Sequence, residues 1–207
     1  MSASAAIEDR PPNARAKLLD AALDVIRAQG YSATSADDLC AAAGVTKGAF
    51  FHHFASKEAL AVAAADHWSA MTGALFAAAP YHDFSEPLDR VLGYIDFRAA
   101  LIAGPVEAFT CLVGTMVQEA FAASPAIREA CGASICDHAR TLEADIAAAM
   151  AQYGVTGFTA ASLALHTQAV LQGAFILAKA RGGPAVALES VAHLKRYFIL
   201  LFQPSPT

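Results

Sequence analysis

The chain has 207 residues, a net charge of −5 and 56% hydrophobic residues, and this composition excludes a natively disordered protein. No apolar stretch reaches the ~20 residues that cross a bilayer, so the sequence predicts no membrane partner. Residues 1–10 do not resemble an export leader. Four cysteines without a paired framework indicate reduced thiols in a cytoplasmic protein. The acidic balance argues at first against a nucleic-acid partner.

Apolar residues recur at helical spacing between regularly placed caps and prolines, and no segment alternates as a strand does. Residues 1–12 are expected to form a disordered tail. Polar caps at Asn13, Ser35, Thr46 and Ser56 begin the first four helices, and prolines begin most of the later ones. The sequence predicts an all-α protein with nine helices, at residues 13–29, 35–43, 46–53, 56–79, 87–103, 105–123, 125–153, 159–181 and 184–202.

Residues 26–60 are the segment that indicates most about the function of the protein. Two short helices are joined there by a turn at Gly44, which is typical of a pair of helices set at a steep angle. Leu39, Val45, Phe50 and Phe54 are spaced to form a small core beneath that angle. The second helix presents free N–H groups, one lysine and little bulk, a shape that fits the ~12 Å major groove of DNA.

The same stretch contains a dense series of short motifs. Gly-Tyr at residues 30–31 and Thr-Ser at 34–35 are followed by Ala-Gly-Val-Thr-Lys-Gly at 43–48, and His-Phe and Ser-Lys-Glu close the series at 53–58. This pattern resembles the helix-turn-helix of the TetR/AcrR family of transcriptional regulators. Phe51 departs from the pattern, because the family commonly has a phosphate-contacting tyrosine there. Cys40 also departs, since a smaller residue is expected.

The resemblance implies a DNA-binding domain at residues 13–55 and a ligand-binding and dimerisation domain at residues 56–207. Thr34, Ser35 and Lys57 are then expected to contact phosphates, with Phe51 at the position of a further phosphate contact. Residues expected on or near base edges are Thr46, Lys47, Gly48, Ala49, His52 and His53.

The charge is divided unevenly between these two parts. Residues 1–60 hold six basic and seven acidic residues, a net charge of −1, whereas the rest holds eight and twelve, a net charge of −4. The expected DNA-binding domain is therefore nearly neutral. We expect weak non-specific binding to double-stranded DNA and specific binding that depends on a dimer.

A short recognition helix reads few base pairs, so the resemblance implies a homodimer on a palindrome. The small pair Ala169 and Gly173 lets helices approach closely, and the last helix carries an apolar stripe. An alternative is that both faces belong to the core of one chain. The expected dimer interface consists of Ala169, Gly173, Val191, Leu194, Phe198 and Leu201.

The middle helices are expected to enclose a cavity for a small apolar effector, as in the family. Either His166 or Gln168 is expected to orient that molecule by a polar contact. The expected lining residues are Trp68, Phe76, Phe109, Cys111, Met116, Phe121, His166, Gln168 and Phe175.

We therefore predict a TetR-type repressor that binds a palindromic operator as a dimer and is released by an effector. One alternative is a thiol-based sensor of electrophiles or oxidants that uses Cys111, near the start of a helix. Another is a ligand-binding helical protein that has lost operator binding. No catalytic motif is present, so no enzyme activity and no cofactor are expected. Cys131 and Cys136 are spaced wrongly for a metal site.

Overall fold

The computed structural model describes residues 13–203, and the secondary structure within that range is entirely helical, as predicted. The expected tail at residues 1–12 lies outside the described residues. The helices are α1 (Ala14–Gln29), α2 (Ala36–Ala43), α3 (Lys47–His53), α4 (Lys57–Ala77), the 3-10 helix η1 (Pro80–Asp83), α5 (Pro87–Ala100), α6 (Val106–Phe109), α7 (Leu112–Ala120), α8 (Pro125–Arg140), α9 (Glu143–Tyr153), α10 (Ala160–Arg181) and α11 (Ala185–Leu201).

The first four helices begin where the sequence places their caps. The side chains of Asn13, Ser35, Thr46 and Ser56 each accept a hydrogen bond from the backbone N–H three residues later. Ser35 forms a full capping box, because the Asp38 carboxylate also accepts from the Ser35 backbone N–H at 2.8 Å. Local chemistry is therefore sufficient to define these helix starts.

Two of the nine expected helices are each divided in two. Residues 105–123 form α6 and α7, because Thr110 and Cys111 have extended backbones and the Cys111 thiol caps α7 by accepting from the Gly114 N–H at 3.4 Å. Residues 125–153 form α8 and α9. There the Thr141 hydroxyl donates to the His138 carbonyl at 2.7 Å, a local bond that competes with the helical ladder.

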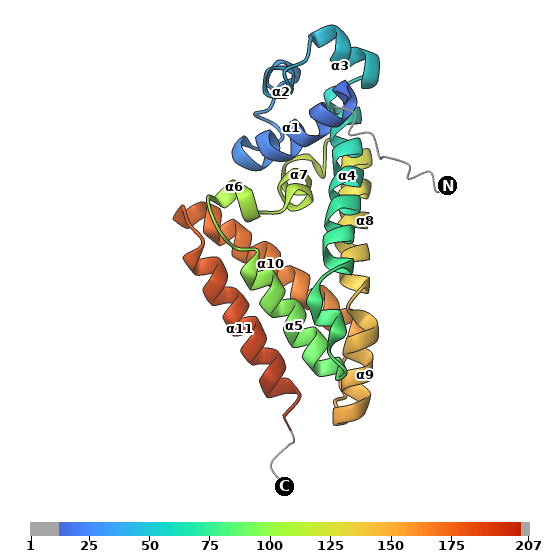
Figure 1. The fold of residues 1–207 in the computed structure, drawn as a ribbon, viewed down its shortest axis with the longest axis vertical. Helices are drawn as coiled ribbons and strands as arrows, with labels where there is room; N and C mark the ends of the chain where they lie inside the picture. Colours follow the sequence, from blue (N-terminus) through green and yellow to red (C-terminus); the bar gives the residue numbers. More distant parts are fainter. Residues whose placement is uncertain (1–12, 204–207) are drawn as a thin grey trace, which may run out of the picture.

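The molecule is elongated, with α1–α3 at one end and α4 running from that end beside α8 (Figure 1). Buried side chains form two clusters. One joins α1–α3 to α4, α7 and α8, and the other joins α5 to α9, α10 and α11. The first cluster continues across residue 56, so shared packing joins α1–α3 to α4, α7 and α8.

Within residues 13–203, α10 is the single helix whose length and mean hydropathy, 1.3, match those of a membrane span. It packs against α8, α9 and α11, and Leu171, Ala174 and Ala178 are buried in the second cluster. A core helix of a soluble protein meets the same criteria, so α10 does not indicate membrane insertion.

Candidate nucleic-acid interface and effector cavity

The α2–α3 pair has the geometry of a helix-turn-helix. Gly44 adopts the left-handed conformation at φ 63° and ψ 38°, which closes the turn without the steric cost that a side chain would add. Below the turn, Leu39 and Phe50 are fully buried and Phe54 is nearly so. Val45 packs against the same core. The turn and this core set the direction of the seven-residue helix α3.

The expected base-contacting residues share the outer face of α3. Thr46, Lys47, Gly48 and His52 are exposed, and Ala49 and His53 are partly buried. The Phe51 ring is 52% exposed and meets the ring of Phe50 edge-on. This face has little bulk at the helix N-terminus, a shape that suits entry into a groove.

Lys47 does not extend freely from this face. Its ammonium lies 2.8 Å from the carboxylate of Asp37 on α2, and that ion pair raises the pKa of Lys47. Both side chains are more than half exposed, so the pair itself is weak. DNA binding would replace the Asp37 carboxylate by a phosphate or a base edge.

The expected phosphate contact of Thr34 needs correction. The side chain is 1% exposed, and its hydroxyl donates to the Gly30 carbonyl at 2.6 Å. This places the hydroxyl inside the turn before α2, where it cannot reach a phosphate. Ser35 stays exposed, although its hydroxyl also serves the capping box.

Lys57, at the first residue of α4, supports the same turn. Its ammonium donates to the carbonyls of Tyr31 at 3.0 Å and Thr34 at 2.8 Å, and it lies 4.3 Å from the centroid of the Tyr31 ring. Because an ammonium has three N–H donors, one remains for the expected phosphate contact.

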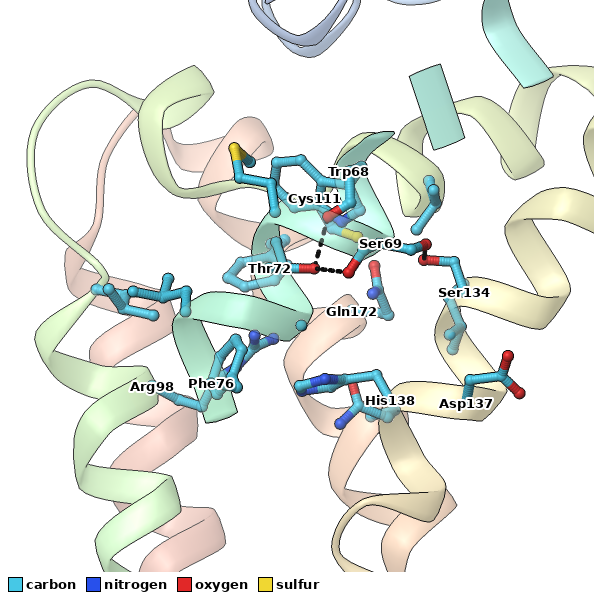
Figure 2. Close-up of a pocket in the computed structure, with 18 of the residues that line it drawn as sticks. Trp68, Ser69, Thr72, Phe76, Arg98, Cys111, Ser134, Asp137, His138 and Gln172 are labelled. Carbon is cyan, nitrogen blue, oxygen red and sulfur yellow. Dashed lines mark hydrogen bonds between the residues drawn. The ribbon is translucent and has the colours of Figure 1, made fainter. Parts of the chain in front are cut away.

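A cavity of about 530 Å³ lies between α4, α5, α6, α8 and α10. Six of the expected effector residues line it: Trp68, Phe76, Phe109, Cys111, Gln168 and Phe175. Its size falls within the ~300–1,000 Å³ that small-molecule pockets occupy. Figure 2 shows Trp68, Thr72 and Phe76 on one helix facing Ser134 and His138 on another.

The other three expected effector residues lie outside this cavity. Met116 is fully buried in the first cluster, because α7 starts anew at Leu112 and faces α1 and α4. Phe121 follows the last residue of α7 and is 57% exposed. His166 is exposed on α10, with its ring 5.4 Å from that of Tyr197. None of these three side chains is placed to contact an effector in the cavity.

Two lining residues that were not among the expected effector contacts are Arg98 and His138. Burial lowers the pKa of His138 to about 4, with a further contribution from the positive charge of Arg98. The neutral imidazole lies 3.0 Å from the Tyr94 hydroxyl, which also accepts from the Gln168 amide at 3.1 Å. Arg98 could have been identified from helical spacing, because it lies on the same face of α5 as the buried residues Val91, Tyr94 and Ile95.

Family comparison agrees with this arrangement of helix-turn-helix and cavity. A model of TetR-family bacterial regulatory proteins matches residues 18–64, and a model of the C-terminal domain of LmrA/YxaF-like transcriptional regulators matches residues 87–193. The chain belongs to the TetR family. Members of this family are transcriptional regulators, not enzymes. No curated protein matches the sequence.

Solved structures of TetR regulators share the fold. A TetR-family regulator from Agrobacterium tumefaciens superposes with a TM-score of 0.78 at 22% identity, over 89% of this chain and 96% of that one. A regulator from Chloroflexus aurantiacus has a TM-score of 0.77 at 25% identity, over 90% and 94% of the two chains. The reduced form of Escherichia coli NemR has a TM-score of 0.75 at 22% identity, over 88% and 95%.

In this TetR-family chain, the stripe expected on α11 as a dimer interface lies inside the protomer. Val191, Leu194 and Phe198 are buried in the second cluster, and Leu201 packs against it. A different face of α10 and α11 is open to solvent, with Ala169 exposed and free space beside Gly173. The large apolar side chains of α10 and α11 that are 38% or more exposed are Leu165, Ile176, Leu177, Leu188, Tyr197, Ile199 and Leu200.

The cavity of the TetR-family chain is connected to its helix-turn-helix through α1. The Arg27 guanidinium donates to the Ala108 carbonyl on α6 at 3.1 Å, and both residues line the cavity. On the other side, the Glu119 carboxylate of α7 accepts from the Ser32 N–H at 2.7 Å. Gly30, which precedes this contact, has a φ of 91°, a backbone conformation that residues with a side chain rarely adopt, and this explains the glycine.

Proposed function

We propose that this chain is a repressor that binds a palindromic operator as a homodimer and is released when a small molecule enters the cavity. The observation that carries the proposal is the position of the cavity. Its wall includes Arg27 of α1, the helix that packs on both α2 and α3. A ligand that moves this wall changes the angle of the recognition helix.

The exposed face of α10 and α11 supports the dimer. Leu165, Ala169 and Ile176 repeat at helical spacing on α10, and Leu188 and Ile199 do so on α11. Contiguous apolar surface of this kind marks protein–protein contacts. We assign it to a second copy of the chain, because the TetR family dimerises through its last two long helices as a four-helix bundle.

A mobility-shift experiment with the DNA upstream of the chain's own coding sequence tests this function. We expect a specific complex and a protected palindrome whose half-sites lie about one helical turn, ~34 Å, or a multiple apart. Ala49→Glu should abolish the complex, because it places a negative charge on the expected base-reading face of α3. Asp89→Asn serves as a control on a distant exposed residue.

Failure to form a specific complex at low salt would reject the repressor and leave a ligand-binding protein that has lost operator binding. We propose a cytoplasmic location, because a repressor must reach its operator on the DNA. We therefore expect the purified protein to be soluble without detergent.

A thiol-based signal is the second candidate, because Cys111 combines access to the cavity with a place at the start of α7. Thiolates are favoured near helix N-termini. Treatment of the operator complex with N-ethylmaleimide should release DNA from the wild type and not from Cys111→Ser. Equal release from both proteins would exclude Cys111 as the sensor.

A further inference from the structure

Arg98 is partly buried and extends the buried face of α5 toward the cavity. The residues three, four and seven places before it, Ile95, Tyr94 and Val91, lie on the same helix face and are buried at 2% exposure or less. An arginine at the next turn of that face carries a permanent charge to the wall of the cavity. Apolar side chains normally occupy such positions, so this charge needs an explanation.

Aromatic rings surround the guanidinium. Its Cζ lies 5.2 Å from the ring centroid of Phe76, 5.8 Å from that of Phe175 and 6.0 Å from that of Tyr94. Phe76 and Phe175 line the cavity themselves. These rings hold the guanidinium in place without neutralising its charge.

No carboxylate of residues 13–203 forms a salt bridge with Arg98. Two aspartates line the cavity, but Asp137 pairs with Arg140 and Asp66 is exposed. The cation therefore lies beside apolar walls and lacks a counter-charge from the described part of its own chain.

The titratable groups near Arg98 are neutral at physiological pH. Burial raises the pKa of Tyr81 to about 12 and also raises that of Tyr94. Burial and the guanidinium together lower the pKa of His138 to about 4. These three groups therefore do not repel an arriving anion, and the Asp137 carboxylate, which also lines the cavity, is paired with Arg140.

Neutral hydrogen-bonding groups lie opposite the guanidinium. Figure 2 shows the Gln172 amide and the His138 ring reaching into the space beside Arg98 and Phe76. Toward α6, the lining becomes aromatic and aliphatic, with Trp68, Phe109 and Ile102. The α6 end also holds the Arg27 guanidinium, but that charge is paired with Asp24, so the unpaired charge lies at the Arg98 end and the α6 end is mainly apolar.

We propose that the effector is a small organic carboxylate whose acid group pairs with Arg98 and whose aromatic or alkyl body fills the apolar end. A guanidinium binds a carboxylate through two parallel hydrogen bonds, which fixes the orientation as well as the affinity. This proposal rests on the proposed function, and it changes the expected effector from an apolar molecule to an amphipathic anion.

Direct binding tests the proposal without DNA. Trp68 is the single tryptophan of the chain and lines the cavity, so its fluorescence reports on ligands there. The probes are matched pairs of equal shape, 4-phenylbutanoate with 4-phenylbutanamide and octanoate with octanamide. We expect the carboxylate of at least one pair to bind roughly tenfold tighter than its amide, as suits a charge-assisted pair.

Three variants test whether the preference for the carboxylate over the amide depends on Arg98. In Arg98→Met the carboxylate should lose about tenfold in affinity, and the amide should change less than about threefold. Arg98→Lys keeps the charge and should retain part of the preference. Arg196→Met removes an exposed charge on α11 and should leave the preference intact. Circular dichroism confirms that each variant is folded.

Equal affinity of carboxylate and amide in both pairs would overturn the proposal, as would an equal loss of both in folded Arg98→Met. Competition by millimolar sulfate as effective as that by the carboxylates would assign the site to an inorganic anion and also overturn it. Preferential carboxylate binding without any operator complex would reject the repressor function alone.

Discussion

The Arg27 guanidinium of α1 lies over the indole of Trp68 on α4, with 5.3 Å between the Cζ atom and the ring centroid. Arg27 also forms an ion pair with Asp24 at 2.9 Å, and its side chain is 13% exposed. This contact joins the helix that carries the helix-turn-helix to the wall of the cavity. Under the proposed function, this contact would let operator binding and effector binding influence each other.

If the proposed function is correct and operator binding shifts α1 relative to α4, the fluorescence of Trp68 should change. We expect a measurable change in emission intensity on titration with the operator. In Arg27→Leu most of this change should disappear, since the guanidinium no longer covers the indole. Unchanged emission of the wild type at saturating operator would contradict this coupling route.

Asp37 holds the Lys47 ammonium at 2.8 Å, so under the proposed function it should compete with DNA for Lys47. Asp37→Asn should raise operator affinity by roughly threefold at low salt and steepen the salt dependence. Two effects act together, because the substitution frees the lysine and removes a negative charge near the phosphates. Asp89→Asn, with the same change of charge on α5, should have no effect; an equal gain in both variants would point to net charge alone.

His138 makes the fold sensitive to acid. Its pKa is lowered to about 4 in the folded chain from the ordinary 6.5, so the unfolded chain binds the extra proton. Stability is therefore complete above pH 6.5 and falls as the pH decreases toward 4. Between pH 7 and 4.5 we expect this group to account for a loss of about 2 kcal/mol.

Urea denaturation at the two pH values measures that loss. His138→Gln retains a hydrogen-bonding partner for Tyr94 and should lose about 2 kcal/mol less than the wild type on acidification. His166→Gln, an exposed residue on α10, is the matched control. The assignment is wrong if the two variants respond to acid alike.

A charge at the centre of the exposed α10 face should separate the dimer. Ala169→Glu is expected to sediment as a monomer with a wild-type helical spectrum, because the residue is solvent-exposed within one protomer. Operator affinity should fall about 100-fold or more, since a single head reads only one half-site. Ala100→Glu, exposed on α5, should remain dimeric. A monomeric wild type in analytical ultracentrifugation would refute the assignment.

Much of the helix-turn-helix follows from sequence alone. The caps at Asn13, Ser35 and Thr46 and the turn at Gly44 depend on bonds within a few residues, so the local sequence specifies them. The exposed positions of Lys47 and His52 follow from the same short helix. Thr34 differs, because its inward direction depends on how the turn folds back on the Gly30 carbonyl.

Which residues pack against each apolar helix face depends on the tertiary structure. Helical periodicity predicts that Val191, Leu194 and Phe198 are buried, but it cannot distinguish burial in the same chain from burial in a second copy. It also could not predict the extended backbone at Cys111, which directs Met116 to the first core and leaves Phe121 exposed.

The cavity also shows the difference between what helical periodicity predicts and what only the packing of distant helices establishes. Helical periodicity places a charged residue, Arg98, on the face of α5 that carries Val91, Tyr94 and Ile95. Only the tertiary structure brought Phe76, Phe175 and His138 around it from three other helices, and only there did the lack of a counter-charge become visible. Local sequence encodes helices and their faces, whereas the environment of a charge is set by residues distant along the chain.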